Sequence, residues 1–401
     1  MRIVKAGWGR RMVHAGWRGI VIDGLSADVG RLVRPGRGAA AGGGFALMLT
    51  IALAGCGDPV VILGDAPGVM RVVAGKPDDL EPAERVPATD FELSSPRGLA
   101  LGADGTLYIA DRRAARILAV RANGDVAVVA DHSGCSGPAC MRRPEALALA
   151  PDGTLLVADG RAGRVFQVAP GAAGDGAVAV LAGDPGGEPP ASGLPAAEAR
   201  FGEPTGVAVS GTGDVFVSDW PEHRVWRIAL DGTLVPAAGN GRAGSSGDGG
   251  PATEARLRAP RGLAVADGRL YIADAADQRV RVVDLDTGII EPVAGSGTQG
   301  FSGDGGPAHR ARLAFPEAVV AVDGGTTLFI ADRGNRRVRA VDTATGVIRT
   351  FAGNGASDYN GSGLEAGETA LPAPAGLASD LGFLFIADDQ LNLVWRTPIR
   401  F

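Results

Sequence analysis

Along residues 96–401, apolar residues come in short runs that alternate with polar turns. Residues 328–331, 337–341 and 347–352 show this clearly, because each run is rich in Val, Ile, Phe and Ala, and Gly, Asn, Asp and Thr separate the runs. Short runs of β-branched and aromatic residues with such boundaries indicate strands. We therefore predict an all-β chain in which strands follow one another closely.

The strand pattern is repeated along the chain. Its clearest element is a strand that ends in Ala-Asp or Ser-Asp, and successive copies of this aspartate lie 48, 60, 55, 58 and 56 residues apart. Each such strand follows a Pro-x-(Gly/Ala)-hydrophobic segment. A four-strand unit of this period predicts the blades of a propeller. The repeated aspartates are Asp111, Asp159, Asp219, Asp274, Asp332 and Asp388.

The six aspartates would form a ring of carboxylates, which invites a catalytic interpretation. Their identical placement before a turn favours a structural role, in which each accepts backbone N–H groups as in an Asx-turn. Two Gly-Asp-Gly-Gly runs, at residues 247–250 and 303–306, lack the spaced carboxylates of a calcium-binding loop. We interpret these runs as tight turns.

The first and last units appear incomplete until they are joined. Residues 69–74 align with the fourth strand 347–352, but no other strands of a unit precede them. The last unit begins at Pro374 and stops after its third strand, 393–397. Pairing residues 69–74 with that strand closes the ring and removes exposed edges. We predict a monomeric, six-bladed propeller of four-stranded blades over residues 68–401.

The repeat resembles the NHL repeat over most of the chain. The resemblance rests on PRGLA at residues 260–264, YIAD at 271–274 and their counterparts in the other units. The SGDGGPA loops at 246–252 and 302–308 are similar to loops of bacterial NHL proteins and teneurin-type propellers. The resemblance implies the six-bladed fold and is a poor guide to function.

The N-terminal region has the organisation of a secretion signal. Residues 1–37 are basic, residues 45–53 are the most apolar stretch, and Leu-Ala-Gly-Cys follows, ending at Cys56. The stretch is too short to span a membrane comfortably. The ending resembles a bacterial lipobox, which implies lipid attachment at Cys56; an ordinary signal peptide with a chance cysteine is the alternative. Residues 1–55 would be removed, and residues 56–67 would form a tether.

This interpretation places the protein in the bacterial cell envelope, in the outer membrane where the host has one, with the lipid as its only membrane contact. The whole chain carries a net charge of −6, and the first 55 residues hold eight basic and two acidic side chains, so that −12 remains after their removal. An acidic body disfavours nucleic acid and anionic lipid surfaces as partners.

Two further cysteines, Cys135 and Cys140, lie in a loop between the first two units. An exported protein favours a disulfide that shapes this loop. A metal pair is the alternative, although only His132 lies near in sequence.

Four loops that precede a unit are unusually long: 184–204, 240–260, 296–316 and 354–374. Loops of this length are often functional. The middle two have Ala and Leu at matching offsets, so we favour a structured cap over the blade interface above a dedicated ligand loop. Trp220 replaces a polar turn on the same face, either as a protein or glycan contact or folded over the next blade.

The residue after the proline that begins each unit is expected at the mouth of the central channel. Each Arg there would have a Glu on the next blade. The carboxylates could hold Ca²⁺, or the mixed ring could bind a zwitterionic or sugar-like ligand; we favour ion pairs that neutralise each other. The candidate binding residues are Arg97, Glu145, Thr205, Arg261 and Glu317, with Ala375 in the sixth unit.

Two classes of function remain. One is a binding or scaffold module for a protein or glycan, which sequence does not distinguish from a structural part of an envelope assembly. The other is an enzyme, since NHL-like propellers resemble gluconolactonase-type lactonases and peptidyl-hydroxyglycine lyases with a metal in the channel. The three histidines after residue 56 lie in predicted loops, and Asn and Asp partners beside Glu145 or Glu317 are not found. We expect a non-enzymatic module without cofactor, with a calcium-dependent, lactonase-like hydrolase as the alternative.

Overall fold

The computed structural model divides the chain into two compact units, Met1–Pro67 and Gly68–Phe401. It describes residues 68–399 except 78–86, 133, 136, 138–139, 170–177 and 381, together with two strands of the first unit. These strands are β1 (Leu47–Ile51) and β2 (Val60–Gly64), which pair antiparallel. Cys56 and most of the predicted signal lie outside the described residues. Within the described part of the chain, no helix has the length and apolarity that crossing a membrane requires.

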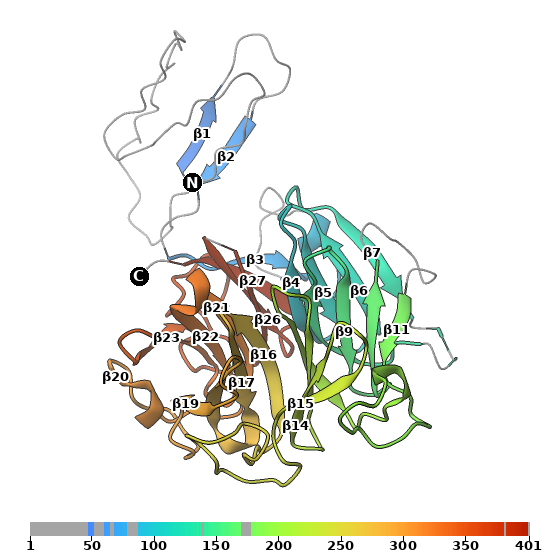
Figure 1. The fold of residues 1–401 in the computed structure, drawn as a ribbon. Coiled ribbons are helices and arrows are strands. Elements are labelled where there is room, and N and C mark those ends of the chain that lie inside the picture. The colour runs from blue at the N-terminus through green and yellow to red at the C-terminus, as the bar shows by residue number, and fades with distance from the viewer. Residues whose placement is uncertain are drawn as a thin grey trace, which may run out of the picture. The chain divides into compact units, whose positions relative to one another are not determined.

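The second unit is the predicted all-β propeller (Figure 1). Blades 1 to 3 each contain four antiparallel strands in chain order. Blade 1 comprises β4 (Pro96–Leu101), β5 (Leu107–Asp111), β6 (Arg116–Val120) and β7 (Val126–Asp131). Blade 2 comprises β8 (Pro144–Leu149), β9 (Leu155–Asp159), β10 (Arg164–Val168) and β11 (Val178–Ala182). Blade 3 comprises β12 (Pro204–Val209), β13 (Val215–Asp219), β14 (Arg224–Ile228) and β15 (Leu234–Ala238).

Blades 4 to 6 repeat the pattern, and blade 5 gains a two-residue edge strand, β20 (Gly306–Pro307). Blade 4 comprises β16 (Pro260–Ala266), β17 (Arg269–Asp274), β18 (Arg279–Asp284) and β19 (Ile290–Ala294). Blade 5 comprises β21 (Pro316–Val322), β22 (Thr327–Asp332), β23 (Arg337–Asp342) and β24 (Val347–Ala352). Blade 6 comprises β25 (Pro374–Ser379), β26 (Phe383–Asp388), β27 (Leu393–Pro398) and β3 (Arg71–Ala74).

The last blade closes as predicted from the repeat. Strand β3 pairs antiparallel with β27, and Figure 1 shows these two strands side by side. The paired strand is shorter than the predicted 69–74, because Val69 forms a bridge to Glu365 in the preceding loop. The ring is therefore fastened both by the sheet and by that loop.

The core lies between the blades. Six hydrophobic clusters occur in the described part of the chain, and each joins the faces of two neighbouring blades. One of them packs Ile109 and Leu118 of blade 1 against Ala387 and Val394 of blade 6, so the joint that closes the ring is packed like the others. Burial of apolar faces between blades thus stabilises the ring at every joint.

The Gly in the repeated Pro-x-(Gly/Ala) segment has a steric cause. The first strands of neighbouring blades approach closely around the channel, and a Cβ at Gly376 would collide with the carbonyl oxygen of Arg97 on the next blade. A Cβ at Gly206 would meet the carbonyl oxygen of Arg261 in the same way. Small residues at this position let the first strands of adjacent blades pack together.

The long loops are structured caps, as predicted. In the loop before blade 4, Ala252, Ala255 and Leu257 are at most 2% exposed. The N–H of Gly249 donates to the carbonyl of Ile290 on the outer strand of blade 4 at 2.8 Å. Each such loop leaves one blade and covers the edge of the next, which protects an exposed strand edge.

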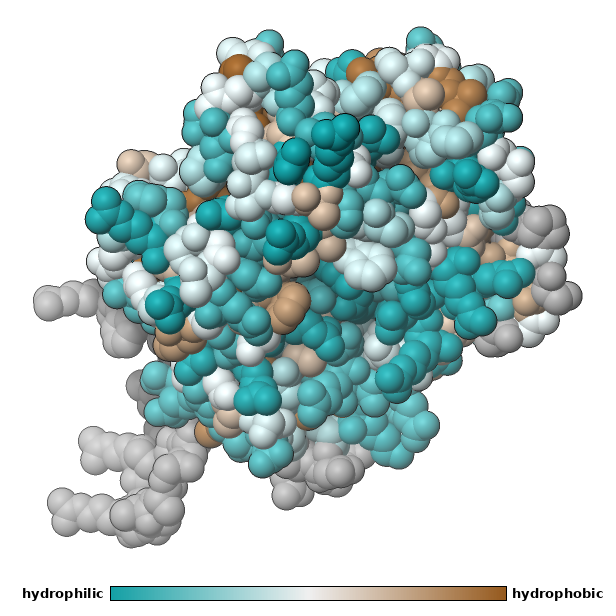
Figure 2. Space-filling view, turned by 90° about the horizontal axis from the view of Figure 1, so that it is seen from below, coloured by the Kyte–Doolittle hydropathy of each residue, from teal (hydrophilic) through white to brown (hydrophobic). Residues whose placement is uncertain are grey.

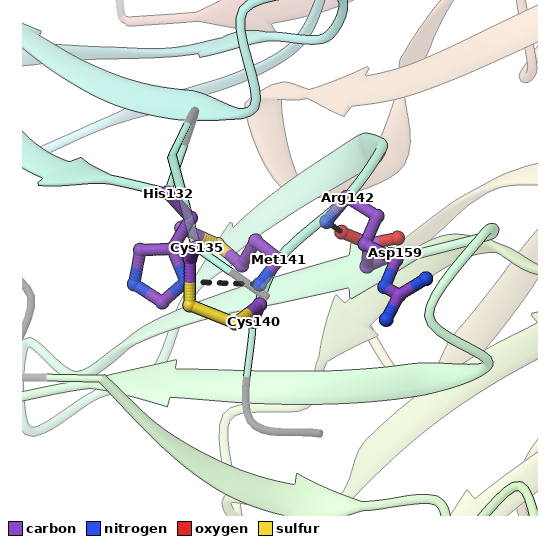
Figure 3. Close-up of a disulfide and its surroundings, with 6 residues drawn as sticks. All are labelled: His132, Cys135, Cys140, Met141, Arg142 and Asp159. Carbon is purple, nitrogen blue, oxygen red and sulfur yellow. Dashed lines mark hydrogen bonds between the residues drawn. A yellow bond between two sulfur atoms is a disulfide. The ribbon is translucent and has the colours of Figure 1, made fainter. Parts of the chain in front are cut away.

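The Cys135–Cys140 disulfide is present and confirms that pairing over the metal alternative (Figure 3). It clips the loop between β7 and β8, with Cα atoms 5.7 Å apart. His132 is buried beside it, and its Nδ1 accepts the N–H of Met141 at 3.0 Å. The histidine thus binds the backbone where the loop returns to blade 2.

The repeated aspartates are structural, as predicted, but they do more than form Asx-turns. All six are 0% exposed. Each accepts a backbone N–H from the loop that enters its own blade, as when Ala314 donates to Asp332 at 2.7 Å. Among the described residues, only Asp159 and Asp388 also accept backbone N–H groups from the turn that follows them. Their common role is to fix each incoming loop against the end of the second strand.

Candidate functional site: the mouth of the central channel

The predicted ring of residues comes together at the channel mouth. The first strand of each blade runs along the channel, and its second residue faces the opening because a proline begins the strand in the same register each time. These side chains border a cavity of about 60 Å³. We call this set the rim: Arg97, Glu145, Thr205, Arg261, Glu317 and Ala375.

The neighbouring Arg–Glu pairs occur as predicted. Arg97 Nη1 lies 2.6 Å from Glu145, and Arg261 Nη1 lies 3.1 Å from Glu317. Arg97 also donates to Glu317 at 2.9 Å, although one blade separates them. Blade 6, which lies between, contributes only the small Ala375, and this leaves room for Arg97 to reach past it.

Five further charged residues join the rim, and sequence reasoning missed them. Arg112 and Arg143 both contact Glu145, Glu203 contacts Arg143, and Asp389 lies between Arg97 and Arg333. Three of the five follow a repeated aspartate directly, and the other two precede the proline that begins a blade. The repeat register was therefore the available signal. We call these five residues and the four charged rim residues the rim network.

The network contains five guanidiniums and four carboxylates, and Arg97 is its centre. Burial raises the pKa of Glu145, but Arg97 and Arg112 outweigh burial, so the pKa lies below the usual range and the carboxylate is ionised. For Arg97, burial is outweighed by Glu317 and Glu145, which raise its pKa. Arg261 differs, because burial lowers its pKa and the attraction of Glu317 does not restore it.

Thr205, the uncharged rim candidate, makes contacts within the fold. Its Oγ1 lies 3.3 Å from the carbonyl oxygen of Pro260, and it lies 3.4 Å from Ser218 Oγ. Ser218 in turn donates to the carbonyl of Arg261 at 2.6 Å. These bonds tie blade 3 to blade 4 directly behind Arg261.

Trp220 lies beside the rim and is folded towards the next blade, which is one of its two predicted interpretations. The guanidinium of Arg261 lies 5.4 Å from the centre of its ring. The side chain is half-buried, and its role as a protein or glycan contact stays a prediction. A tryptophan and an arginine in contact are the residue types that most often anchor a ligand at an interface.

Two more aromatic side chains are exposed on loops of this face. Phe315, which precedes the proline of blade 5, is 44% exposed and has a positive φ of 48°. Its N–H donates to Gln278 of blade 4 at 2.7 Å, which holds it in that conformation. Phe301 is equally exposed and lies against the guanidinium of Arg337. Nothing in the repeat pattern singled out these two positions.

The family comparison matches one of the six blades. The NHL repeat model matches residues 201–228, which run from the entry of blade 3 to the end of its third strand. The same strands, turn and aspartate recur in all six blades. The chain is a six-bladed NHL-repeat propeller.

Known proteins resemble this NHL propeller in part. NHL repeat-containing protein 2 of Gallus gallus is 27% identical over 220 residues, which cover 49% of this chain and 30% of that protein. The match thus spans less than a third of that relative. Its remaining length has no counterpart in the match.

Solved structures share the fold at low identity. An auxiliary nutrient binding protein from Bacteroides thetaiotaomicron superposes with a TM-score of 0.58 at 14% identity, covering 82% of this chain and 76% of that one. A gluconolactonase from Xanthomonas campestris superposes with a TM-score of 0.53 at 17% identity, covering 82% and 89%. At these identities the likeness concerns the fold alone.

The carboxylates of this NHL propeller do not gather as a metal site would need. Glu145, Glu317 and Asp389 each lie within 3.5 Å of at least two guanidinium groups. Among the described residues, the one group of three potential ligand side chains is His132 with Cys135 and Cys140, and a disulfide joins the two sulfurs. A cation at the rim would have to displace arginine from these oxygens.

Proposed function

We propose that this NHL propeller is an exported, lipid-anchored binding module that receives a glycan or protein on its long-loop face. The observation that carries the proposal is Trp220 stacked on Arg261 beside a charged channel mouth. The two auxiliary nutrient binding proteins among the solved structures support a binding role, because they use the same fold.

The surface favours a glycan over a protein ligand. The exposed large hydrophobic residues belong to four different blades or their loops: Val128, Val180, Leu230, Phe301, Phe315 and Val347. On the face seen in Figure 2, hydrophilic side chains predominate and hydrophobic ones are scattered. Protein interfaces usually have an apolar core, whereas a sugar needs one aromatic ring and several polar groups. Trp220 and the rim network offer that combination.

A metal-dependent hydrolase or lactonase-like enzyme is the second candidate. The fold shared with a gluconolactonase favours it. The ion pairs of Glu145 and Glu317 count against it, because both carboxylates are already bound by arginine. The binding module is therefore the better supported proposal.

The N-terminal sequence alone supports the proposed export and lipid anchoring. Labelling cells with a radioactive fatty acid tests them: the full chain should become labelled and fractionate with membranes. The Cys56→Ser variant should lose the label. Labelling that persists in this variant would rule out the proposed attachment site.

The ligand proposal is tested with a glycan array probed by the full chain. We expect a restricted set of glycans to bind, and the Trp220→Ala variant to bind them about tenfold more weakly. Leu230→Ala, at an exposed position in the turn between β14 and β15, is the control and should have no effect. An array without any bound glycan, together with hydrolysis of a lactone panel, would favour the enzyme instead.

A further inference from the structure

The rim network has more positive than negative side chains. Its five guanidiniums face four carboxylates, so the network carries one excess positive charge although each guanidinium contacts at least one carboxylate. Such an imbalance in a half-buried site is costly unless an anion balances it. The positive groups are Arg97, Arg112, Arg143, Arg261 and Arg333, and the negative groups are Glu145, Glu203, Glu317 and Asp389.

Unused N–H groups mark where that anion would bind. Arg97 is 91% buried, and its Nε, which lies 3.5 Å from Asp389, makes no hydrogen bond with any described residue. Arg261 donates one Nη1–H to Glu317, and its other N–H groups have no partner in the described part of the chain. Both side chains line the same cavity. A buried guanidinium N–H that makes no hydrogen bond is unusual and points to a missing acceptor.

Arg261 has a single carboxylate partner among the described residues, Glu317. Burial lowers the pKa of Arg261 below the ordinary value; Glu317 and Glu145 oppose this effect, while the neighbouring Arg97 and Arg333 add to it. A ligand carboxylate would give this guanidinium a second counter-charge and accept its free N–H groups. Arginine suits this role, since its planar group binds a carboxylate through two parallel hydrogen bonds.

The size of the cavity limits what enters it. A volume of about 60 Å³ is enough for a few water molecules or one acidic group. It is well below the several hundred Å³ that enclose a whole small-molecule ligand. The acidic group would therefore enter the mouth while the rest of the ligand lies outside, over Trp220.

We propose that the ligand of this face is an acidic glycan whose uronic acid carboxylate enters the channel mouth between Arg97 and Arg261, while an adjoining sugar ring lies on Trp220. The proposal rests on the binding function above and names its ligand class. A free carboxylate and an acidic peptide share part of this chemistry, and the choice of a glycan depends on Trp220 and on the polar surface around it.

Calorimetric titration of the full chain in detergent tests the proposal with four probes. These are a trimer of α-1,4-linked galacturonate, its fully methyl-esterified form, free galacturonate and a short Glu-rich peptide. We expect the acidic trimer to bind most tightly and esterification to weaken it about tenfold or more, since a hydrogen bond to a charged group is lost. Free galacturonate should bind more weakly than the trimer, because it lacks the ring over Trp220.

Protein variants locate the interaction. Arg261→Gln should weaken the acidic trimer about tenfold and leave the ester unchanged; Glu317 keeps Arg97 as its partner in this variant. Trp220→Ala should weaken both forms of the trimer. Arg269→Gln, at the exposed start of β17, is the matched control and should change neither. Thermal unfolding confirms that each variant is folded, and Arg333→Gln replaces Arg261→Gln if the latter is not.

Several outcomes would overturn the inference. Equal affinity for the trimer and its ester would show that the carboxylate is not recognised, although the protein would still bind a glycan. Tighter binding of the peptide than of any sugar would make the ligand a protein. Absence of binding to all four probes would reject the acidic glycan as the ligand. If a neutral glycan still bound on the array, the proposed binding function would stand although this inference had failed.

Discussion

Asp248 and Arg281 form a clip between a long loop and the blade that it covers. Arg281, in the third strand of blade 4, is 1% exposed, and its Nε donates to Asp248 Oδ1 at 2.9 Å. It also donates to the carbonyl of Arg256 in the same loop at 2.9 Å. The Gly-Asp-Gly-Gly run that we interpreted as a tight turn therefore supplies the counter-charge of a buried arginine. Blade 5 repeats the clip with Arg339 and Asp304.

Removing Asp248 should destabilise the propeller more than removing Asp304. Asp248 is the only carboxylate that Arg281 contacts among the described residues, whereas Arg339 also lies 3.4 Å from the buried Asp332. We expect Asp248→Ala to lower the free energy of unfolding by about 2 kcal/mol, less than for a pair buried on both sides because Asp248 is partly exposed. Asp304→Ala should cost about half as much. Urea unfolding measures both, and equal losses would contradict the role of Asp332.

The pH dependence of stability should depend on Asp274. Burial raises its pKa to about 7, and its Oδ2 is buried without a partner among the described residues. A raised carboxyl pKa means that the folded state binds the proton more tightly than the unfolded state. Its stabilising contribution is therefore complete below the ordinary aspartate pKa and is lost as the pH rises through about 7.

Asp274→Asn should remove this share of the pH dependence. Between pH 5 and 8 the variant should lose about 2 kcal/mol less stability than the parent protein, as measured by urea unfolding at each pH. Asp159→Asn is the control. Asp159 accepts four backbone N–H groups, two on each oxygen, and an amide cannot accept on both sides. The Asp159→Asn variant should therefore be less stable than the parent protein at every pH. If Asp274→Asn left the pH dependence of stability unchanged, Asp274 would not be its source.

Closure of the ring by β3 should decide whether the propeller folds cooperatively. A chain that begins at Lys76 lacks Met70 and Val72, which are buried against blade 6, and it leaves β27 without its outer partner. We expect a broad, non-cooperative unfolding transition and a tendency to associate through the open edge. A chain that begins at Gly68 is the control and should unfold sharply. A sharp transition of unchanged midpoint in the shorter chain would contradict closure by β3.

The features that depend on the repeat period could be predicted from the sequence. Pro96, Pro260 and their counterparts set the start of each blade, so the rim residues and the closing strand could be placed by alignment within the chain. The burial of Arg281 could not be read from its own strand, since a charged residue there usually faces solvent. The signal was a correlation between repeats: only blades 4 and 5 have an arginine at this position, and only their loops contain Gly-Asp-Gly-Gly.

The rim network was predicted only in part, because some of its residues lie on regular strands and others lie in turns. The repeat places Arg97 and Glu145 on regular strands, where side-chain direction follows from alternation. Arg333 and Asp389 lie in turns after the second strand, and their direction depends on how the incoming loop is fixed by the buried aspartate. The contact between Arg97 and Glu317 further depends on the small side chain of Ala375, which acts only in three dimensions.

The metal content of the purified protein, with its melting temperature in calcium and in a chelator, tests the ion-paired rim most directly. Because arginine occupies Glu145 and Glu317, we expect no stoichiometric metal and the same melting temperature in both solutions. A stoichiometric metal, with a calcium-dependent rise in melting temperature that the Glu145→Gln, Glu317→Gln double variant loses, would contradict the ion-paired rim and favour the hydrolase.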